Sequence, residues 1–253
     1  ILTIEPSKKE EGTIWVGTDD GNLQLTRDGG KTWTNFRGKI PGMPLGCWIP
    51  QVKASAHNAG EVFVVANDYR RGDMKPYIFR TADYGKTWTR MIDENKVKGY
   101  ALCVQQDPAE PNLIFVGTEN GLWISFDNGA SFEQFKNGYP SVSTYDFAIQ
   151  EREADLVIAT FGRALWVLDD IRPLRKAAAN KGMKFTAPVT AFAAPDAYQA
   201  EYRSATGYEW STYGLYEADN RSPGAAISFF INKPKTDSAK QAPTPAEQSP
   251  AVE

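Results

Sequence analysis

Short apolar segments alternate with turn residues along positions 1–172 of this chain. The segments at 13–16, 113–116 and 156–159 read Thr-Ile-Trp-Val, Leu-Ile-Phe-Val and Leu-Val-Ile-Ala. Each is rich in β-branched or aromatic residues and leads into a turn that contains glycine. Because such runs bounded by turn residues are typical of strands, the pattern predicts an all-β protein.

An eight-residue motif recurs three times between these segments. It reads Thr-Arg-Asp-Gly-Gly-Lys-Thr-Trp at 26–33, Thr-Ala-Asp-Tyr-Gly-Lys-Thr-Trp at 81–88 and Ser-Phe-Asp-Asn-Gly-Ala-Ser-Phe at 125–132. The shared aspartate can accept hydrogen bonds from nearby backbone groups, and the glycine two residues later tolerates a positive φ. The motif therefore predicts a tight turn closed by an aromatic residue. Its defining residues are Asp28, Gly30, Trp33, Asp83, Gly85, Trp88, Asp127, Gly129 and Phe132.

The spacing of the motif aspartates is that of β-propeller blades, which repeat every few tens of residues. We predict a partial propeller of four-stranded blades, each with an inner strand, two middle strands and an outer strand after the motif. The blades are expected at 1–37, 47–92, 99–136 and 142–172. Asp169 marks a decayed fourth motif. The first unit begins inside its inner strand, so we expect further N-terminal blades, or a partner chain, to complete the ring.

The remainder of the chain differs in composition. Residues 173–222 are aromatic and irregular and are expected to wrap the propeller, with a short helix within 176–184. Residues 223–232 predict a strand, and residues 233–253 predict a linker or disordered tail because they are rich in proline, alanine and serine.

Composition and charge narrow the class of protein. Hydrophobic residues make up 42% and charged residues 23%, as in ordinary globular proteins. The net charge of −3 argues against a nucleic-acid partner. No apolar run is long enough to predict a membrane span. Cys47 and Cys103 fall about four positions apart on neighbouring strands of the repeat, too far for a disulfide, so we expect free buried thiols.

The motif resembles the Asp-box repeat of sialidases, xyloglucanases and sortilin-type propellers. The chain looks most like secreted bacterial sortilin-like proteins, which are often labelled glycosyl hydrolases from their repeats. The resemblance rests on the three Asp-boxes and on segments 68–77 and 159–170. It implies a secreted, periplasmic or cell-surface protein whose propeller is followed by a β-sandwich. Phe161 departs from the pattern, because relatives tend to have histidine there.

In enzymes with this repeat, the active site lies on the face opposite the Asp-boxes, so the boxes themselves are interpreted as structural. The opposite face carries candidate catalytic carboxylates, since a glycosidase needs two of them beside a cleft. They are Asp20, Asp73 and Glu119. It also carries candidate ligand-binding arginines. These are Arg70, Arg71 and Arg163. The alternative is that all six are solvated turn residues. For Arg70 and Arg71 we favour bracing through Asp68 or Asp73 over ligand binding.

Several kinds of chemistry lack their signature residues. His57 is the only histidine, so neither a metal site nor a catalytic triad is indicated. No glycine-rich phosphate loop is present, and no cofactor is expected. We therefore favour a non-enzymatic module for protein or glycan binding or for assembly. The alternative is a glycoside hydrolase with part of its active site in missing blades. A peptide-binding propeller like sortilin would instead have an apolar patch in its tunnel.

Overall fold

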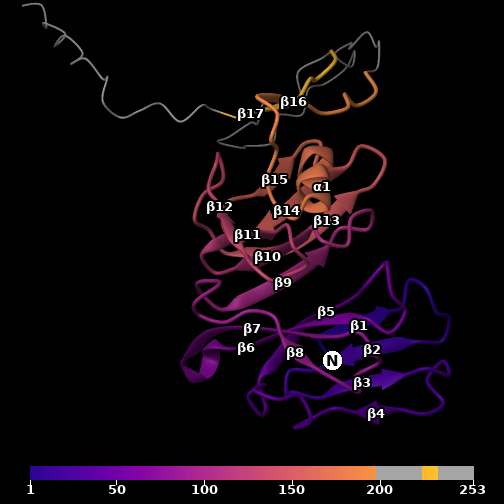
Figure 1. Ribbon diagram of the computed structural model, residues 1–253. Helices are drawn as coiled ribbons and strands as arrows, with labels where there is room; N and C mark the ends of the chain where they lie inside the picture. The colour runs from indigo at the N-terminus through magenta and orange to yellow at the C-terminus, as the bar shows by residue number, and fades with distance from the viewer. Residues whose placement is uncertain (198–223, 233–253) are drawn as a thin grey trace, which may run out of the picture.

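The computed structural model describes residues 1–197 and 224–232 as four antiparallel sheets stacked one on the next, one helix and a small two-stranded sheet (Figure 1). The first sheet contains β1 (Thr3–Pro6), β2 (Ile14–Gly17), β3 (Leu23–Thr26) and β4 (Thr34–Asn35). The second contains β5 (Trp48–Ala54), β6 (Val62–Asp68), β7 (Asp73–Thr81) and β8 (Thr89–Arg90). The third contains β9 (Ala101–Gln106), β10 (Ile114–Thr118), β11 (Gly121–Ser125) and β12 (Glu133–Phe135). The fourth contains β13 (Thr144–Gln150), β14 (Asp155–Thr160) and β15 (Leu165–Leu168).

This arrangement confirms the predicted fold class, a partial β-propeller. Every sheet follows the order of its strands in the chain, and all pairs are antiparallel. The first strands are neighbours in sequence order, with β1 beside β5, β5 beside β9 and β9 beside β13. They are therefore the inner strands of successive blades around a common axis.

The Asp-box turns have the predicted chemistry. In the first box, Asp28 Oδ1 accepts hydrogen bonds from Thr32 N at 2.9 Å and Thr26 Oγ1 at 2.8 Å, and Asp28 Oδ2 accepts from Thr32 Oγ1 at 2.6 Å. Gly30 has φ 96° and donates its N–H to Thr26 Oγ1 at 2.9 Å. The same set of contacts recurs around Asp83 and Asp127.

The Asp-box glycines also fit one blade against the next. A Cβ on Gly85 would lie 2.4 Å from Phe36 Cε1 of the preceding blade, and a Cβ on Gly129 would lie 2.4 Å from Met91 Cε. Phe36 and Met91 each stand eight residues after the aspartate of their own box. Phe135 occupies the same position in the third blade and packs against the core shared with the fourth. Each repeat thus supplies an apolar side chain that covers the following blade.

The fourth blade departs from the prediction because it has three strands rather than four. Its outer strand is replaced by α1 (Arg172–Ala179), which begins before the predicted helix because Pro173 suits a first helical turn. Arg175 from α1 forms an ion pair at 2.9 Å with Asp107, whose side chain is fully buried. The decayed box therefore leads into a helix that packs back onto the third blade.

The C-terminal predictions are only partly within the described residues. A strand does occur in 223–232, as β17 (Phe229–Ile231), and it pairs with β16 (Val189–Ala191). The rest of the predicted wrapping segment, from 198 on, and the predicted tail at 233–253 lie outside the described residues.

Cys47 and Cys103 are buried free thiols. Burial raises the pKa of Cys47 to about 11 and raises that of Cys103 well above its usual value. Within the part of the chain that the structure describes, no helix has the length and apolar character needed to cross a membrane.

Candidate functional site

The two ends of the sheets carry different turns. Each Asp-box lies at the same end of its blade as the turn between the first and second strands. Hydrogen bonds connect the two, such as those from Tyr84 N to Gly60 O and from Asn128 N to Asn112 O, both at 3.0 Å. The turns between second and third strands lie at the opposite end, with the connections between blades. We call this end the far face. The six candidate catalytic and ligand-binding residues were predicted to lie on this face.

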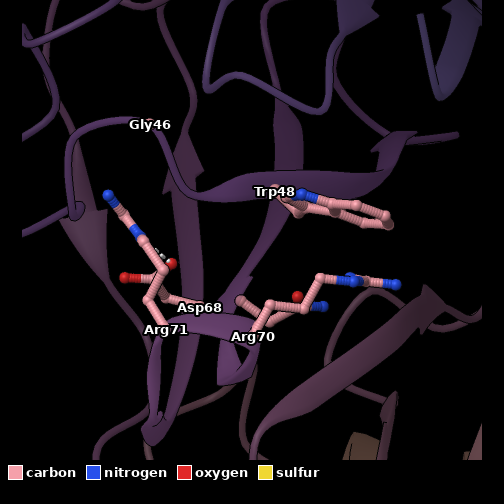
Figure 2. Close-up of a pocket in the computed structure, with 6 residues that line it drawn as sticks. Gly46, Trp48, Asp68, Arg70 and Arg71 are labelled. Atoms are coloured by element: carbon pink, nitrogen blue, oxygen red, sulfur yellow. Dashed lines mark hydrogen bonds and ion pairs between the residues drawn. The ribbon is translucent and has the colours of Figure 1, made fainter.

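A stack of planar side chains stands on the far face of the second blade. The 3₁₀ turn Tyr69–Arg71 joins β6 to β7 and ends at Gly72, whose φ is 85°. It places the Arg70 guanidinium carbon 3.1 Å from the centroid of the Trp48 ring and 4.6 Å from that of Tyr69. Tyr69 in turn stacks on Tyr100 at 4.4 Å with an interplanar angle of 18°. Figure 2 shows Arg70 extended beneath the Trp48 indole.

Arg71 points the other way and braces the loop (Figure 2). Its Nε donates to Asp68 Oδ1 at 2.6 Å, and its Nη2 donates to the Leu45 carbonyl at 2.7 Å. The hydrogen bond to Asp68 raises the pKa of Arg71. This side chain therefore ties the connection before β5 to the turn between β6 and β7. A cavity of about 50 Å³ lies here. It is lined by Gly46, Trp48, Asn67, Asp68, Arg70 and Arg71.

Aromatic residues continue from this stack toward the fourth blade. Tyr145 and Phe161 are both exposed, and their ring centroids lie 5.8 Å apart. Burial raises the pKa of Tyr100, and the neighbouring Glu119 and Tyr145 add to the effect. We call the resulting set the aromatic band. It consists of Trp48, Tyr69, Tyr100, Tyr145 and Phe161.

A larger cavity of about 440 Å³ lies between the inner strands and is lined by residues of β1, β5, β9 and β13. Gln51 crosses it, donating from Nε2 to Asp146 Oδ1 at 2.9 Å and accepting from Val104 N at 2.8 Å. Tyr145 lines this cavity as well, so the aromatic band reaches the central channel. The lining mixes polar and apolar groups. It includes Ile4, Glu5, Pro50, Val52, Lys53 and Leu102.

Two of the three candidate carboxylates are held by hydrogen bonds from residues close to them in the chain. Asp20 accepts hydrogen bonds from Thr18 and, at 2.8 Å on both oxygens, from Asn22 Nδ2. These bonds, led by the one from Thr18, lower the pKa of Asp20. Asp73 Oδ2 accepts from the Tyr77 hydroxyl at 2.8 Å. Burial first, and then this bond, raise the pKa of Tyr77 to about 12.

The other two candidates on the far face lie in the third and fourth blades. Glu119 packs its side chain against the backbone of Gly99. Arg163 is exposed in the turn after β14, and the cavity beside Arg70 and Arg71 does not include it. The six predicted residues therefore share a face without converging on one cavity.

Within the described ranges, no group of three His, Cys, Asp or Glu side chains is placed so that it could hold a metal ion. His57 has a structural position instead. Its Nε2 lies 2.8 Å from the Asp107 carbonyl oxygen, so it links the second blade to the third.

Sequence reasoning missed most of the aromatic band. Trp48, Tyr100 and Tyr145 stand at or beside the starts of the inner strands β5, β9 and β13. An aromatic residue recurring at that place in three repeats is a signal that an alignment of inner strands could have found.

No protein-family model matches the sequence. Among curated proteins, the chain is 33% identical over 110 residues to an oligoxyloglucan-reducing end-specific xyloglucanase of Emericella nidulans. The match covers 42% of this chain and 13% of that protein. The chain thus spans a small part of this relative's length.

One solved structure supports the observed architecture. A GH74 xyloglucanase from Xanthomonas campestris matches with a TM-score of 0.51 and 14% identity, over 67% of this chain and 29% of the enzyme. The likeness shows the fold alone. YCF48 from Cyanidioschyzon merolae matches with a TM-score of 0.46 and 18% identity, over 65% of this chain and 51% of that protein.

Proposed function

We propose that this propeller binds glycans across its far face, along the aromatic band. The observation that carries the proposal is the run of five aromatic side chains from the second blade to the fourth, two of them exposed. Aromatic rings offer flat apolar surfaces, and nearby polar groups fix a ligand's orientation. Sugar rings have apolar C–H faces and a rim of hydroxyls, which suits such a surface.

The named relative supports a plant-type β-glucan as the first ligand to test. That enzyme is named for its action on oligoxyloglucan, and the chain matches part of it at 33% identity. A propeller that binds such polysaccharides would work outside the cytoplasm, as the Asp-box resemblance also implies. Arg163, exposed in the same turn as Phe161, is then available to hydrogen-bond the hydroxyls of a bound sugar.

The binding test is calorimetric titration of the chain with a xyloglucan heptasaccharide. Replacing Phe161 or Trp48 by alanine is expected to weaken binding about tenfold, the loss of one aromatic contact. Trp33→Ala is the matched control, because Trp33 is partly exposed but belongs to an Asp-box at the other end of the sheets. Absence of binding, or an equal loss with Trp33→Ala, would contradict the proposal.

Glycoside hydrolysis is the second candidate, favoured by the same relative and by the carboxylates Glu5 and Asp146 on one central cavity. A glycosidase pairs a protonated carboxyl with an ionised one. The reaction is tested by reducing-sugar release from the heptasaccharide. Loss of release in Glu119→Gln or Asp73→Asn would assign it to the far face, and loss in Asp146→Asn would assign it to the channel. Binding without release would leave a non-catalytic module.

A further inference from the structure

Two arginines on the far face differ from the others that the structure describes. Every arginine in the described ranges except Arg70 and Arg163 forms an ion pair with an aspartate or a glutamate. Within that part of the chain, the guanidinium groups of Arg70 and Arg163 make no ion pair and no hydrogen bond. Because a guanidinium has five N–H donors, both side chains are able to bind an anionic group.

These two arginines lie at the two ends of the aromatic band. Arg70 is in the turn between β6 and β7, and Arg163 is in the turn between β14 and β15, two residues after Phe161. The Trp48 ring covers one face of the Arg70 guanidinium and Tyr69 lies beside it, at 3.1 and 4.6 Å between the guanidinium carbon and each ring centroid. These contacts leave the N–H groups at the edge of the guanidinium available for two parallel hydrogen bonds to a carboxylate.

The carboxylates next to Arg70 in the chain have other partners. Asp68 pairs with Arg71 at 2.6 Å, and Asp73 accepts a hydrogen bond from the Tyr77 hydroxyl at 2.8 Å. The net charge of the whole chain is −3, so the protein as a whole does not attract anions. A negatively charged ligand on the far face would therefore be held locally, by Arg70 and Arg163.

A buried amide beside Arg70 indicates what carries the negative charge. Asn67 is 2% exposed, and its Nδ2 donates to the Ala101 carbonyl at 3.3 Å. Its Oδ1 is buried and accepts no hydrogen bond from any residue that the structure describes. Asn67 and Arg70 line the same cavity of about 50 Å³. A ligand that satisfies both offers a negative charge and a hydroxyl donor. A uronate sugar carries both groups, whereas a sulfate ion carries only the charge.

We propose that the glycan bound along the aromatic band is acidic, with uronate carboxylates paired to Arg70 and Arg163. This inference rests on the proposed glycan binding and names the class of its ligand. The sugar rings lie against the aromatic side chains, and the carboxylates accept hydrogen bonds from the two guanidinium groups. A neutral oligosaccharide is then held by the rings alone and binds more weakly.

The test compares two oligosaccharides that differ only at C6. Cellohexaose and its C6-oxidised counterpart, a β-1,4-linked hexaglucuronate, have the same linkage and the same ring stereochemistry. Calorimetric titration of the chain should show hexaglucuronate binding at least about tenfold more tightly, the gain expected from one charge-assisted pair. Hexaglutamate, a peptide with as many carboxylates, is the control for charge without sugar.

Variants assign the preference to the arginines. Arg70→Gln retains a planar amide beneath Trp48 but removes the charge, so it should weaken hexaglucuronate binding about tenfold and change cellohexaose binding by less than about twofold. Arg163→Gln should act in the same way on the second carboxylate. Arg37→Gln is the matched control. Arg37 follows β4 in a connection between blades and is half exposed, but it lies outside the aromatic band.

Each way of failing has its own signature. Equal affinity for the two oligosaccharides would leave the proposed glycan binding in place and overturn the acidic class of ligand. Absence of binding to either one would overturn both proposals. Hexaglutamate that binds as tightly as hexaglucuronate, or an equal loss in Arg37→Gln and Arg70→Gln, would show that charge alone is recognised and would also overturn the inference.

Discussion

At the scale of single residues, the Asp-box is a way to hold a tight turn with an ionised carboxylate. Asp83 accepts a hydrogen bond from Thr87 N at 2.9 Å, and its other oxygen accepts from Thr87 Oγ1 at 2.7 Å. These bonds, led by the one from the Thr87 backbone, lower the pKa of Asp83 to about 2. The pKa values of Asp28 and Asp127 are lowered for the same reason. The charged form of each is thus favoured by folding.

This charge preference predicts how stability depends on acid. A carboxyl whose pKa is lower in the folded state adds stability above its unfolded pKa near 4, and the contribution is lost as pH falls through the folded value. The urea midpoint of the wild type should therefore drop between about pH 4 and pH 2. In Asp83→Asn, which cannot ionise, the drop should be shallower. An identical pH profile for Asp83→Asn and the exposed control Asp19→Asn would contradict this.

At the scale of elements, glycine serves two purposes in the Asp-box, and the repeats separate them. All three glycines take a positive φ, but only Gly85 and Gly129 also lie against the preceding blade. The backbone requirement follows from the motif and was predicted from sequence. The packing requirement was not, because Phe36 and Gly85 belong to different repeats and nothing local links them.

Alanine substitutions should measure the two effects apart. Gly30→Ala should cost about 1–2 kcal/mol, the strain of a left-handed backbone in a residue with a Cβ. Gly85→Ala should cost a further ~1–3 kcal/mol, because its methyl group overpacks against Phe36. Urea unfolding of both variants checks the difference. If the two unfold with equal midpoints, Phe36 moves aside freely and the glycine is needed for its backbone alone.

The elements also show where sequence reasoning works. The strands and Asp-boxes were predictable because their apolar runs and turn residues are local signals. The missing outer strand of the fourth blade was not, because its box has lost the glycine and aromatic that mark the turn and α1 follows instead. The stack on Arg70 was missed for another reason: Trp48 and Tyr100 reach it from separate connections between blades, and only the ring geometry brings them together.

At the scale of the whole molecule, each blade contacts its neighbours in the stack and little else. The second and third blades are covered on both faces, and β10 is buried along its whole length. The fourth is covered on one side only, and Leu165 and Val167 on its other side are 69% and 55% exposed. Two polar contacts also link separate blades: His57 with the Asp107 carbonyl between the second and third, and Gln51 with Asp146 between the second and fourth. Stability in such linear arrays is close to a sum of neighbour contacts.

Because the fourth blade is packed on one face only, its strands should open more often than those of the second and third blades. Amides of β13–β15 should exchange with deuterium at least about tenfold faster than those of β6 and β10, because fewer contacts must break to expose them. Hydrogen-exchange mass spectrometry resolves the strands separately. Uniform exchange across all four sheets would mean that the stack opens as one unit.

The apolar residue eight positions after each box aspartate also bears on how such a chain changes length. Every intact repeat carries both that side chain and a glycine able to receive one from its predecessor. A stretch of gene duplicated in phase therefore encodes a blade that already fits the neighbours on either side, and no new contact has to arise. Ring size becomes a property that can shift by whole repeats, and single blades become interchangeable parts for building rings of chosen size.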